Sequence, residues 1–397
     1  MRICFYCDSI FSFGGVQRVL SVIAKELSQR HEVTIVTHDD PSMKDITMYD
    51  LQESEIEYQF INYPDSPFYE YLPSKFYSLL YKKVLPQNNF FSNLYRYSSF
   101  PRSKRLYLIH LLNKCEYDII VGVHAFLSLY LANIKDSLTG KVIGWMHSSY
   151  DAFFQINSPY LKDLKQYFSF VIPRLDKIIV LSFYDQRRYL TYLKFKLPPI
   201  VIYNPMTIKS DFKEYDNNKT FLAVGRFSHQ TKGFDILIKA FALFAKRNQV
   251  WKLDIVGDGP EKNYLSSLIE KYELKSKITL HPFTKKIEDY YKNASIFVLS
   301  SRWEGMPLVL LEAMSYGLPI ISSDIPVAEE LLKGQDCAIF FKNGSILDLC
   351  KKMDEIANKK TDELNYMSQI SLSYVKEFSA DKIVEQWESL FNDLMAE

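Results

Sequence analysis

The sequence predicts an α/β protein built from two doubly wound domains. Short β-branched apolar runs alternate with amphipathic segments along the chain, and 397 residues exceed the usual length of one domain. The alternation also falls into two series, with a polar, turn-rich stretch between them. Near-continuous apolar strands separated by helices are typical of parallel sheets that are covered on both faces.

The first series contains six expected strands, at 2–7, 32–38, 117–124, 141–147, 177–182 and 199–204. The second series contains six more, at 220–226, 251–258, 277–283, 295–301, 319–324 and 338–341. The stretch NPMTIKSDFKEYDNNKT between them reads as a linker. We therefore place the domains at 1–204 and 205–379, and expect ligands at the carboxyl ends of the strands.

Composition excludes several classes of protein. Apolar residues make up 47% and charged residues 24%, which is typical of a folded globular protein, and a net charge of +1 does not favour nucleic acid. No run of eighteen apolar residues predicts a membrane span, and MRICFYCDSIFSFGG reads as a strand and a loop rather than a signal peptide. The five cysteines lack paired spacing, and Cys4 and Cys7 are expected on opposite faces of one strand. We expect reduced thiols and a cytoplasmic protein.

The stretch SRWEGMPLVLLEAMSYGLP contains the most informative carboxylates. Pro307 and Gly317 suit the start and the end of a helix over about 307–316. Glu312 lies inside that apolar helix, and Glu304 lies just before it. Because an unpaired buried charge costs several kcal/mol, Glu312 needs a partner. That partner is either a vicinal diol such as a ribose or a structural group of the protein, and the residues alone leave both open.

Two further features of this half suit a phosphorylated ligand. In AVGRFSHQTKGF, Arg226 and Lys232 flank a polar strand-to-helix turn where two cations suit a diphosphate, although a solvated basic turn is the alternative. The backbone N–H groups near Gly305 and Met306 precede a helix and can bind an anion or a sugar hydroxyl. Gly257, in VGDGP, indicates a tight turn or a close approach to a ligand.

Three positions in the first half are candidates only by their place in the fold. Gly15 precedes an amphipathic helix, but the motif is not GxGxxG, so a dinucleotide site is not favoured. His124 and His147 each end an expected strand and so point to the ligand edge of the sheet. A structural role is the alternative for all three.

Metal and cofactor motifs are missing from the sequence. There is no Asp-x-Asp, GxxxxGK[ST] or GxSxG, and no Cys/His cluster with the spacing of a zinc site. We therefore expect neither a metal nor a cofactor.

Together these motifs resemble the family 4 glycosyltransferases, which are retaining, nucleotide-sugar-dependent enzymes of the GT-B fold. The resemblance rests on FGGVQ, GWMH, VGRFSHQTKGF, VGDGP and EGMPLVLLEAMSYGLPII, in this order. The last matches the E-x7-E pattern of the family, with Glu304 and Glu312 as its ends. It implies two Rossmann-like domains that face across a cleft, and a C-terminal helix, about 380–395, that packs back onto the first domain.

The resemblance also implies roles for the candidate residues. Glu312 would bind the ribose hydroxyls of the donor, and Glu304 would approach its sugar. Arg226 and Lys232 would hold the diphosphate and stabilise it as a leaving group. The remaining expected contacts are His147 at the donor sugar, backbone groups of Gly305, Met306 and Leu308, Gly15 against the phosphates, and Gly257 in the donor site. His147 is preferred to His124 because only His147 lies in the GWMH motif.

The implied activity is transfer of a sugar, with retention, from a nucleotide donor to a saccharide acceptor. We expect a UDP-sugar as donor and a polyprenyl-diphosphate-linked intermediate of a bacterial surface polysaccharide as acceptor. Two alternatives remain: a nucleotide-sugar epimerase of the same fold, and a non-catalytic sugar-nucleotide-binding subunit of a partner enzyme.

The stretch 71–115 contains no Asp or Glu but many cations and aromatic residues. The cations are Lys75, Lys82, Lys83, Arg96, Arg102, Lys104, Arg105 and Lys114, and the aromatic residues are Phe76, Tyr77, Tyr81, Phe90, Phe91, Tyr95, Tyr97, Phe100 and Tyr107. Such a surface suits anionic lipid head groups, so we expect peripheral attachment to the inner face of the cell membrane. The alternative is that a helix over about 101–113 packs its LYLIHLL face on the sheet and shows its cations to water.

Overall fold

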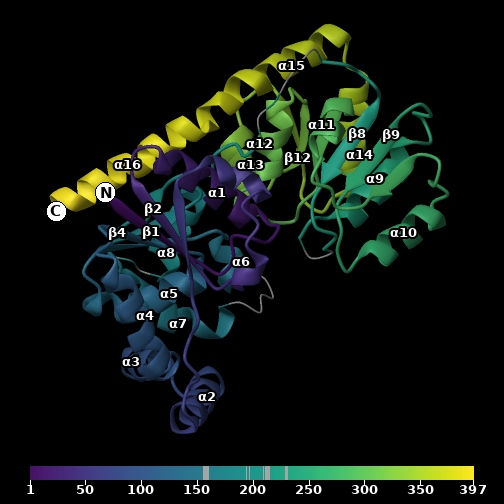
Figure 1. Cartoon of the computed structure of the whole chain (residues 1–397). Coiled ribbons are helices and arrows are strands. Elements are labelled where there is room, and N and C mark those ends of the chain that lie inside the picture. Colours follow the sequence, from purple (N-terminus) through teal and green to yellow (C-terminus); the bar gives the residue numbers. More distant parts are fainter. Residues whose placement is uncertain (155–160, 194, 196, 209, 211–214, 229–230) are drawn as a thin grey trace. The chain divides into compact units, whose positions relative to one another are not determined.

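The structure is a computed structural model that describes residues 1–154, 161–193, 195, 197–208, 210, 215–228 and 231–397 (Figure 1). Parts of the expected linker (209 and 211–214) and of the basic turn (229–230) lie outside the described residues. The chain divides into unit 1, Met1–Pro205 with Ala380–Glu397, and unit 2, Met206–Ser379. Each unit is a parallel sheet with helices on both faces, so the predicted fold class is confirmed.

Unit 1 contains a seven-stranded parallel sheet in the order β3-β2-β1-β4-β5-β6-β7. The strands are β1 (Arg2–Cys7), β2 (Glu32–Thr37), β3 (Ile56–Phe60), β4 (Ile119–Val123), β5 (Lys141–Trp145), β6 (Lys177–Val180) and β7 (Ile200–Val201). The strand β3 was not predicted from the sequence. Only Ile56 of this edge strand is buried and its other residues are at least partly exposed, so β3 lacks the apolar run that predicts the central strands.

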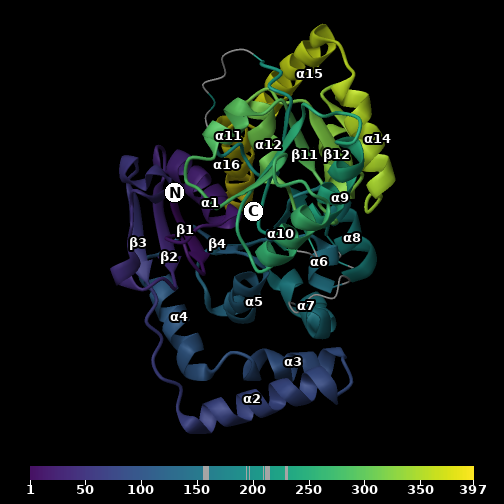
Figure 2. The same ribbon diagram turned by 90° about the vertical axis from the view of Figure 1, so that its right-hand side faces the viewer.

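The helices of unit 1 cover both faces of its sheet, and successive side chains of β1 point alternately to the two faces. The helices are α1 (Gly15–Ser28), α2 (Phe68–Lys83), α3 (Asn89–Ser98), α4 (Arg102–Lys114), α5 (Ala125–Ile134), α6 (Tyr150–Phe154), α7 (Lys165–Val171), α8 (Phe183–Leu193) and α16 (Ala380–Ala396). Cys4 and Tyr6 face one core, which includes buried side chains of α4, α5 and α7. Phe5 points to the opposite face and contacts Trp387 of α16. Figure 2 shows α2 and α3 side by side as a helical hairpin.

The C-terminal helix α16 is held to unit 1 by its own side chains. The fully buried Trp387 packs edge-on against Trp145, with ring centroids 4.8 Å apart. Glu388 forms an ion pair with Arg30, with 2.8 Å between Oε2 and Nη1. Its other carboxylate oxygen, Oε1, lies 2.9 Å from Nε2 of His31. Apolar burial and these charges explain why this terminal segment belongs to unit 1 rather than to the unit that precedes it in the chain.

Unit 2 contains a six-stranded parallel sheet in the order β10-β9-β8-β11-β12-β13. Its strands are β8 (Thr220–Val224), β9 (Lys252–Val256), β10 (Ile278–His281), β11 (Ile296–Leu299), β12 (Ile320–Ser323) and β13 (Ala338–Phe341). Its helices are α9 (Phe234–Phe244), α10 (Lys262–Lys271), α11 (Glu288–Asn293), α12 (Leu308–Ser315), α13 (Pro326–Leu332), α14 (Ile346–Ala357) and α15 (Thr361–Tyr374). Phe221 packs into the core of α9, α10 and α14, whereas Phe297 faces Tyr291 of α11 on the other side.

Both sheets have the same switch in strand order. The order reverses between β1 and β4 in unit 1 and between β8 and β11 in unit 2. Ligands of open α/β sheets bind outside the carboxyl ends of the strands at such a point. The loops that follow these four strands therefore define where a site is to be sought in each unit.

Candidate functional sites at the switch points

In unit 2, the loop after β11 is fastened to the loop after β8. Ser300 Oγ donates to the carbonyl of Lys232 at 2.8 Å, and Arg302 N donates to the carbonyl of Thr231 at 2.7 Å. The Arg302 guanidinium donates to both carboxylate oxygens of Asp235 at 3.0 and 3.1 Å. These contacts fix the two loops of the switch point as one surface.

This fastening brings Lys232 and Glu304 together. The Lys232 ammonium lies 2.7 Å from Glu304 Oε1, which also accepts from Ser301 Oγ at 2.6 Å. Both charged side chains are mostly buried. The Lys232 stem passes Gly225, where an added Cβ would lie 3.0 Å from Lys232 Cε. The predicted pair of Arg226 and Lys232 thus flanks one turn, with Arg226 exposed and Lys232 held by a carboxylate.

Two glycines allow this close approach of loops. Gly233 has φ +63°, and a Cβ there would lie 2.1 Å from the carbonyl oxygen of Ser300. Gly257 has φ +155°, and a Cβ there would lie 2.0 Å from the carbonyl oxygen of Gly225. Any larger residue would separate the strand ends at the switch point. Gly257 therefore has a structural role at the edge where we predict the donor site.

Glu312 is buried in α12, with 3% of its surface exposed. Tyr291 Oη donates to Glu312 Oε2 at 2.8 Å, and Thr207 Oγ1 donates to Oε1 at 3.3 Å. The carboxylate among leucines thus has hydroxyl partners inside unit 2, which the sequence analysis did not identify. A carboxylate oxygen can accept more than one hydrogen bond.

The start of α12 differs slightly from the prediction. The helix begins at Leu308, and Pro307 precedes it and accepts the N–H of Leu310 at 3.0 Å. Gly317 follows the helix with φ +66°, as predicted. The first turn of a helix leaves backbone N–H groups without an intrahelical acceptor. Gly305, Met306 and Leu308 surround this end, where we predict backbone contacts to a sugar.

In unit 1, His147 follows β5 with a buried, unpaired imidazole nitrogen. Nε2 has no hydrogen-bond partner among the residues that the structure describes, and the ring packs on Trp145 with centroids 4.0 Å apart. Burial, and to a lesser extent the nearby His124, holds the pKa of His147 well below its usual range. A neutral imidazole with a free nitrogen can bind a ligand hydroxyl.

His124 and Gly15 also lie at loops of the unit 1 switch point. His124 precedes α5 with φ +88°, a conformation that a non-glycine residue adopts rarely, and its N–H donates to the carbonyl of Trp145 at 2.9 Å. Gly15 begins α1, and the N–H of Gly14 donates to Tyr49 Oη at 3.1 Å. Gly15, His124 and His147 thus share one edge of unit 1.

Asp39, which was not predicted from the sequence, shapes the loop after β1. This buried carboxylate accepts from Ile10 N at 2.7 Å, from Ser9 Oγ at 2.6 Å and from Thr37 Oγ1 at 2.8 Å. A pair of aspartates directly after the second strand was the available signal. Asp39 fixes the loop that carries Gly15.

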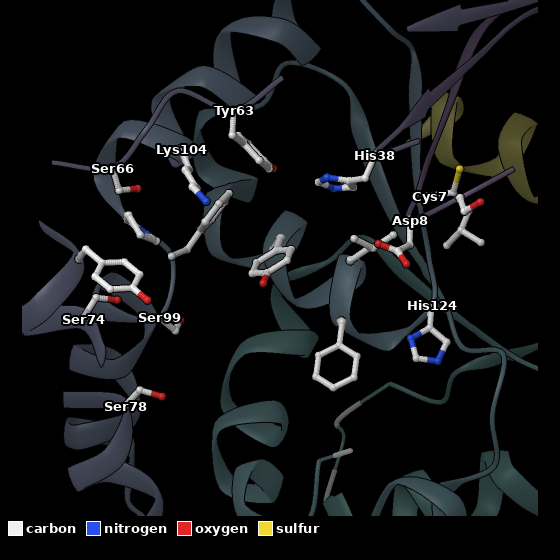
Figure 3. A pocket seen from close by; sticks show the side chains of 18 of the residues that line it. Cys7, Asp8, His38, Tyr63, Ser66, Ser74, Ser78, Ser99, Lys104 and His124 are labelled. Carbon is white, nitrogen blue, oxygen red and sulfur yellow. The ribbon is translucent and has the colours of Figure 1, made fainter. Parts of the chain in front are cut away.

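A hollow in unit 1 was also missed, with Asp8, His38 and His124 on one side (Figure 3). Its volume is about 800 Å³, and its opposite side is formed by α2, α4 and the segments beside them. Because it combines strand ends with helices far apart in the sequence, no single motif marks it.

The basic, aromatic stretch 71–115 forms α2, α3 and α4, and only part of it is surface. The surface interpretation is wrong for Arg96, Tyr81, Tyr95 and Phe100, which are buried. Arg96 Nε donates to the carbonyl of Asn133 at 3.0 Å, because its guanidinium needs an acceptor inside the unit.

The exposed part of this stretch is more apolar than expected. Phe76 is 64% exposed and Phe90 is 67% exposed, and α2 shows further apolar side chains to solvent. Leu108 and Leu112 of α4 are buried, as the alternative interpretation of that helix expected.

The described residues contain neither a helix that could span a bilayer nor a cluster of metal-ligating side chains. No helix among them has the length and hydropathy needed to cross a bilayer. Within the same residues, no group of three or more His, Cys, Asp or Glu side chains is arranged to hold a metal ion.

Comparison with known families gives two matches that together span most of the chain. Residues 13–209 match the family described as Glycosyltransferase Family 4, and residues 206–371 match Glycosyl transferases group 1. An uncharacterized glycosyltransferase of Haemophilus influenzae is 30% identical over 288 residues, which cover 71% of this chain and 78% of that protein.

Other relatives carry names from polysaccharide synthesis. The amylovoran biosynthesis glycosyltransferase AmsD of Erwinia amylovora is 28% identical over 226 residues, 55% of this chain and 62% of AmsD. The O-antigen biosynthesis glycosyltransferase WclY of Escherichia coli is 28% identical over 188 residues, 47% of this chain and 50% of WclY. The chain therefore spans about half or somewhat more of these two relatives.

Solved structures show the same fold at low identity. TarM superposes with a TM-score of 0.77 at 15% identity, over 98% of each chain. Anabaena Alr3699/HepE in complex with UDP superposes with a TM-score of 0.74 at 17% identity, over 99% of this chain and 100% of that one. The expected GT-B fold class is confirmed by these likenesses.

Proposed function

Because this chain belongs to the glycosyltransferases, with domains of Family 4 and group 1, we propose that it transfers a sugar from a UDP-linked donor to a lipid-linked saccharide. The process would be assembly of a bacterial surface polysaccharide: capsule, exopolysaccharide or O-antigen. The observation that carries the donor side is the surface at the unit 2 switch point, where the ion pair of Lys232 and Glu304 precedes α12 in the loops after β8 and β11, and Arg226 is exposed in the loop after β8. The UDP present in the HepE structure supports the choice of base.

In this proposal the donor lies along three features of unit 2. Its ribose diol reaches Glu312, whose carboxylate also accepts from Tyr291 and Thr207. The diphosphate meets Arg226 and Lys232. Glu304 holds Lys232 in place until the ligand arrives and then approaches the donor sugar.

The reaction breaks the bond between the anomeric carbon and the diphosphate oxygen. The acceptor hydroxyl oxygen forms the new bond to that carbon, and its proton passes to the departing diphosphate. Negative charge grows on the diphosphate, and Arg226 and Lys232 stabilise it. Retention would follow from attack on the face from which the diphosphate leaves. No metal or cofactor takes part in this proposal.

His147 would contact the donor sugar through its unpaired Nε2. The lowered pKa keeps its imidazole neutral at pH 7, so it can act as a hydrogen-bonding group beside a sugar. Gly15 would lie against the phosphates and leave space for them.

Membrane attachment would bring the enzyme to a lipid-linked acceptor at the cytoplasmic face of the cell membrane. The exposed apolar side chains of α2 and the cations Lys82, Lys83 and Arg102 would contact anionic lipid. Liposome flotation tests this: binding should require anionic lipid and fall when the three cations are changed to Gln, or when salt is raised. Equal flotation of the variant, or no binding by the native protein, would contradict membrane attachment.

Two other functions are separated by product analysis. An epimerase would convert a nucleotide sugar without an acceptor, and a non-catalytic subunit would leave the donor intact. Arg226 and Lys232 at one turn, with Glu304 and Glu312 in place, favour the transferase.

A thermal-shift screen of nucleotides and nucleotide sugars is the first experiment. A ligand at a hundred times its Kd stabilises the folded protein by about 2.7 kcal/mol, so UDP or a UDP-sugar should raise the melting temperature. The stabilising sugar nucleotide is then incubated with lipid-linked saccharides, and the products are analysed. Absence of stabilisation by every sugar nucleotide would contradict the proposed donor site.

A further inference from the structure

The hollow in unit 1 has chemically different ends. Figure 3 shows Asp8, His38 and His124 on one side, and Lys104 with Ser66, Ser74 and Ser99 on the other. Asp8 and His124 follow β1 and β4, so the first end is the switch point of the unit 1 sheet. The whole hollow has a volume of about 800 Å³, which lies within the range of small-molecule sites.

The outer end is cationic. Lys75 of α2 and Lys104 of α4 both line it, and the only carboxylate among the described lining residues is Asp8. The Lys104 ammonium lies 5.5 Å from the centre of the Tyr63 ring, and the Lys75 ammonium lies 5.4 Å from that of Tyr71. Two lysines resting on aromatic faces, with serine hydroxyls nearby, suit a phosphate group.

The inner end suits a sugar. Asp8 and His38 provide hydrogen-bonding groups at this end, and Phe100 and Tyr130 are among the aromatic residues that line the hollow. Carboxylates accept hydrogen bonds from hydroxyl groups, and apolar ring faces cover the C–H faces of a sugar.

Helix α2 relates the hollow to an apolar surface. Tyr71, Lys75 and Ser78, spaced by four and three residues, line the hollow and so form one stripe of the helix. The neighbouring stripe, displaced by one residue, is Phe68, Leu72, Phe76 and Leu79, which are 75%, 47%, 64% and 60% exposed. The two stripes lie about 100° apart around α2. An apolar face on the same helix as the cationic wall of a sugar-sized hollow matches an amphiphile that has a phosphate between its lipid chain and its saccharide.

We propose that this hollow binds the acceptor as an isoprenoid diphosphate saccharide. The diphosphate lies at Lys75 and Lys104, the isoprenoid chain follows the apolar stripe of α2, and the saccharide points inward to Asp8. This inference rests on the proposed function, and it adds the site of the acceptor and the residues that hold its diphosphate and its lipid chain. A phosphodiester polymer could offer the same anionic group without a lipid, and the experiment separates the two sources.

Calorimetric titration with farnesyl diphosphate, a short isoprenoid diphosphate, tests the site on the full-length chain. The titrations use an Arg226→Gln background, in which diphosphate binding at unit 2 should be weakened. Lys75→Gln with Lys104→Gln should lower affinity by about tenfold or more, the loss expected for charge-assisted contacts. Lys114→Gln, on α4 but outside the hollow, is the matched control and should bind as the parent does.

A second pair of titrations identifies the source of the phosphate. Leu72→Ser with Phe76→Ser should weaken binding of farnesyl diphosphate but leave binding of inorganic diphosphate unchanged. Undiminished affinity in the double lysine variant, or no binding of farnesyl diphosphate by the parent, would overturn the proposal. Inorganic diphosphate bound as tightly as farnesyl diphosphate would overturn the lipid-linked source.

The test of the unit 1 hollow can fail or succeed independently of the proposed donor site in unit 2. UDP stabilisation of the Lys75→Gln/Lys104→Gln variant in a thermal-shift assay should equal that of the native protein. If UDP stabilises the protein but farnesyl diphosphate binding does not depend on the lysines, the acceptor site fails and the proposed donor function stands. If the lysines matter but no sugar nucleotide binds, the donor function fails and the anion site stands.

Discussion

The two switch points of this protein differ in how their charges are arranged. In unit 2, Lys232 pairs with Glu304, and Glu312 accepts from two hydroxyl groups. In unit 1, the hollow carries Lys75 and Lys104, whose ammonium groups rest on aromatic rings rather than on carboxylates. One edge is a closely connected polar surface and the other is an open amphiphilic hollow. Edges of similar topology thus suit ligands of different chemistry.

The largest expected effect on sugar transfer comes from removing a cation at the switch point of unit 2. Arg226→Ala should lower the rate of sugar transfer by roughly a hundredfold or more, because charge on the departing diphosphate loses a partner. Single-turnover kinetics with saturating donor measure this step, and EDTA should change it little. Lys252→Ala is the control, because Lys252 begins β9 and so lies at the amino-terminal edge of the sheet, opposite the edge that carries Arg226. Loss of activity in EDTA, restored by magnesium, would contradict metal-independent leaving-group stabilisation.

Within unit 1, the two histidines of the ligand edge should differ in effect. His147→Ala should lose far more turnover than His124→Ala, because His147 lies in the GWMH motif and its buried Nε2 has no hydrogen-bond partner among the described residues. Turnover is compared at saturating donor and acceptor, after circular dichroism has shown that both variants fold. The opposite ranking would reassign the active-site residue to His124.

Substitution of Glu312 separates a role in donor binding from a purely structural role at the unit 2 edge. Glu312→Gln should weaken donor binding by about tenfold or more, since charge-assisted hydrogen bonds contribute about 1.5–3 kcal/mol each. Tyr291→Phe is the matched control, because it removes a hydroxyl partner of Glu312 and leaves the charge. If both variants lower the melting temperature but bind donor normally, Glu312 is a structural carboxylate only.

The smallest effect expected concerns pH. Burial lowers the pKa of His147 and of His124 in the folded chain, whereas an unfolded histidine titrates near about 6.5. Below that pH the unfolded state binds more protons, so the free energy of unfolding should fall as pH decreases from 7 to 5, by at most about 1.4 kcal/mol per group and pH unit. Urea unfolding across this range should show a shallower decline in His147→Gln. The same slope in the variant would indicate that His147 does not titrate as inferred.

Most of the fold could be predicted from the sequence because the core strands are buried on both faces. Runs such as RICFYC show no polar alternation, and so indicate a parallel sheet wherever they occur. The exception, β3, lies at the edge of the sheet, where Glu57 is exposed and Gln59 is partly exposed, and both polar residues weaken the apolar signal.

The candidate site was predictable only where it lies in one continuous segment. Glu304, Glu312 and the start of α12 lie within a few turns of one another in the chain, so their spacing is visible in the sequence. The partners of Glu312 come from α11 and from residue 207, and no local pattern indicates them. The hollow of unit 1 depends on tertiary packing alone, because Asp8 and Lys104 are far apart in sequence.

The central claim, that unit 2 binds the nucleotide and unit 1 binds the acceptor, is tested most directly by calorimetric titration of UDP into three proteins. These are the native chain, Arg226→Gln, and Lys75→Gln/Lys104→Gln. We predict that Arg226→Gln weakens UDP binding by about tenfold or more, as expected for charged contacts to a phosphate, while the double lysine variant binds UDP as the native chain does. Native UDP affinity in Arg226→Gln, together with lost affinity in the double lysine variant, would contradict this assignment.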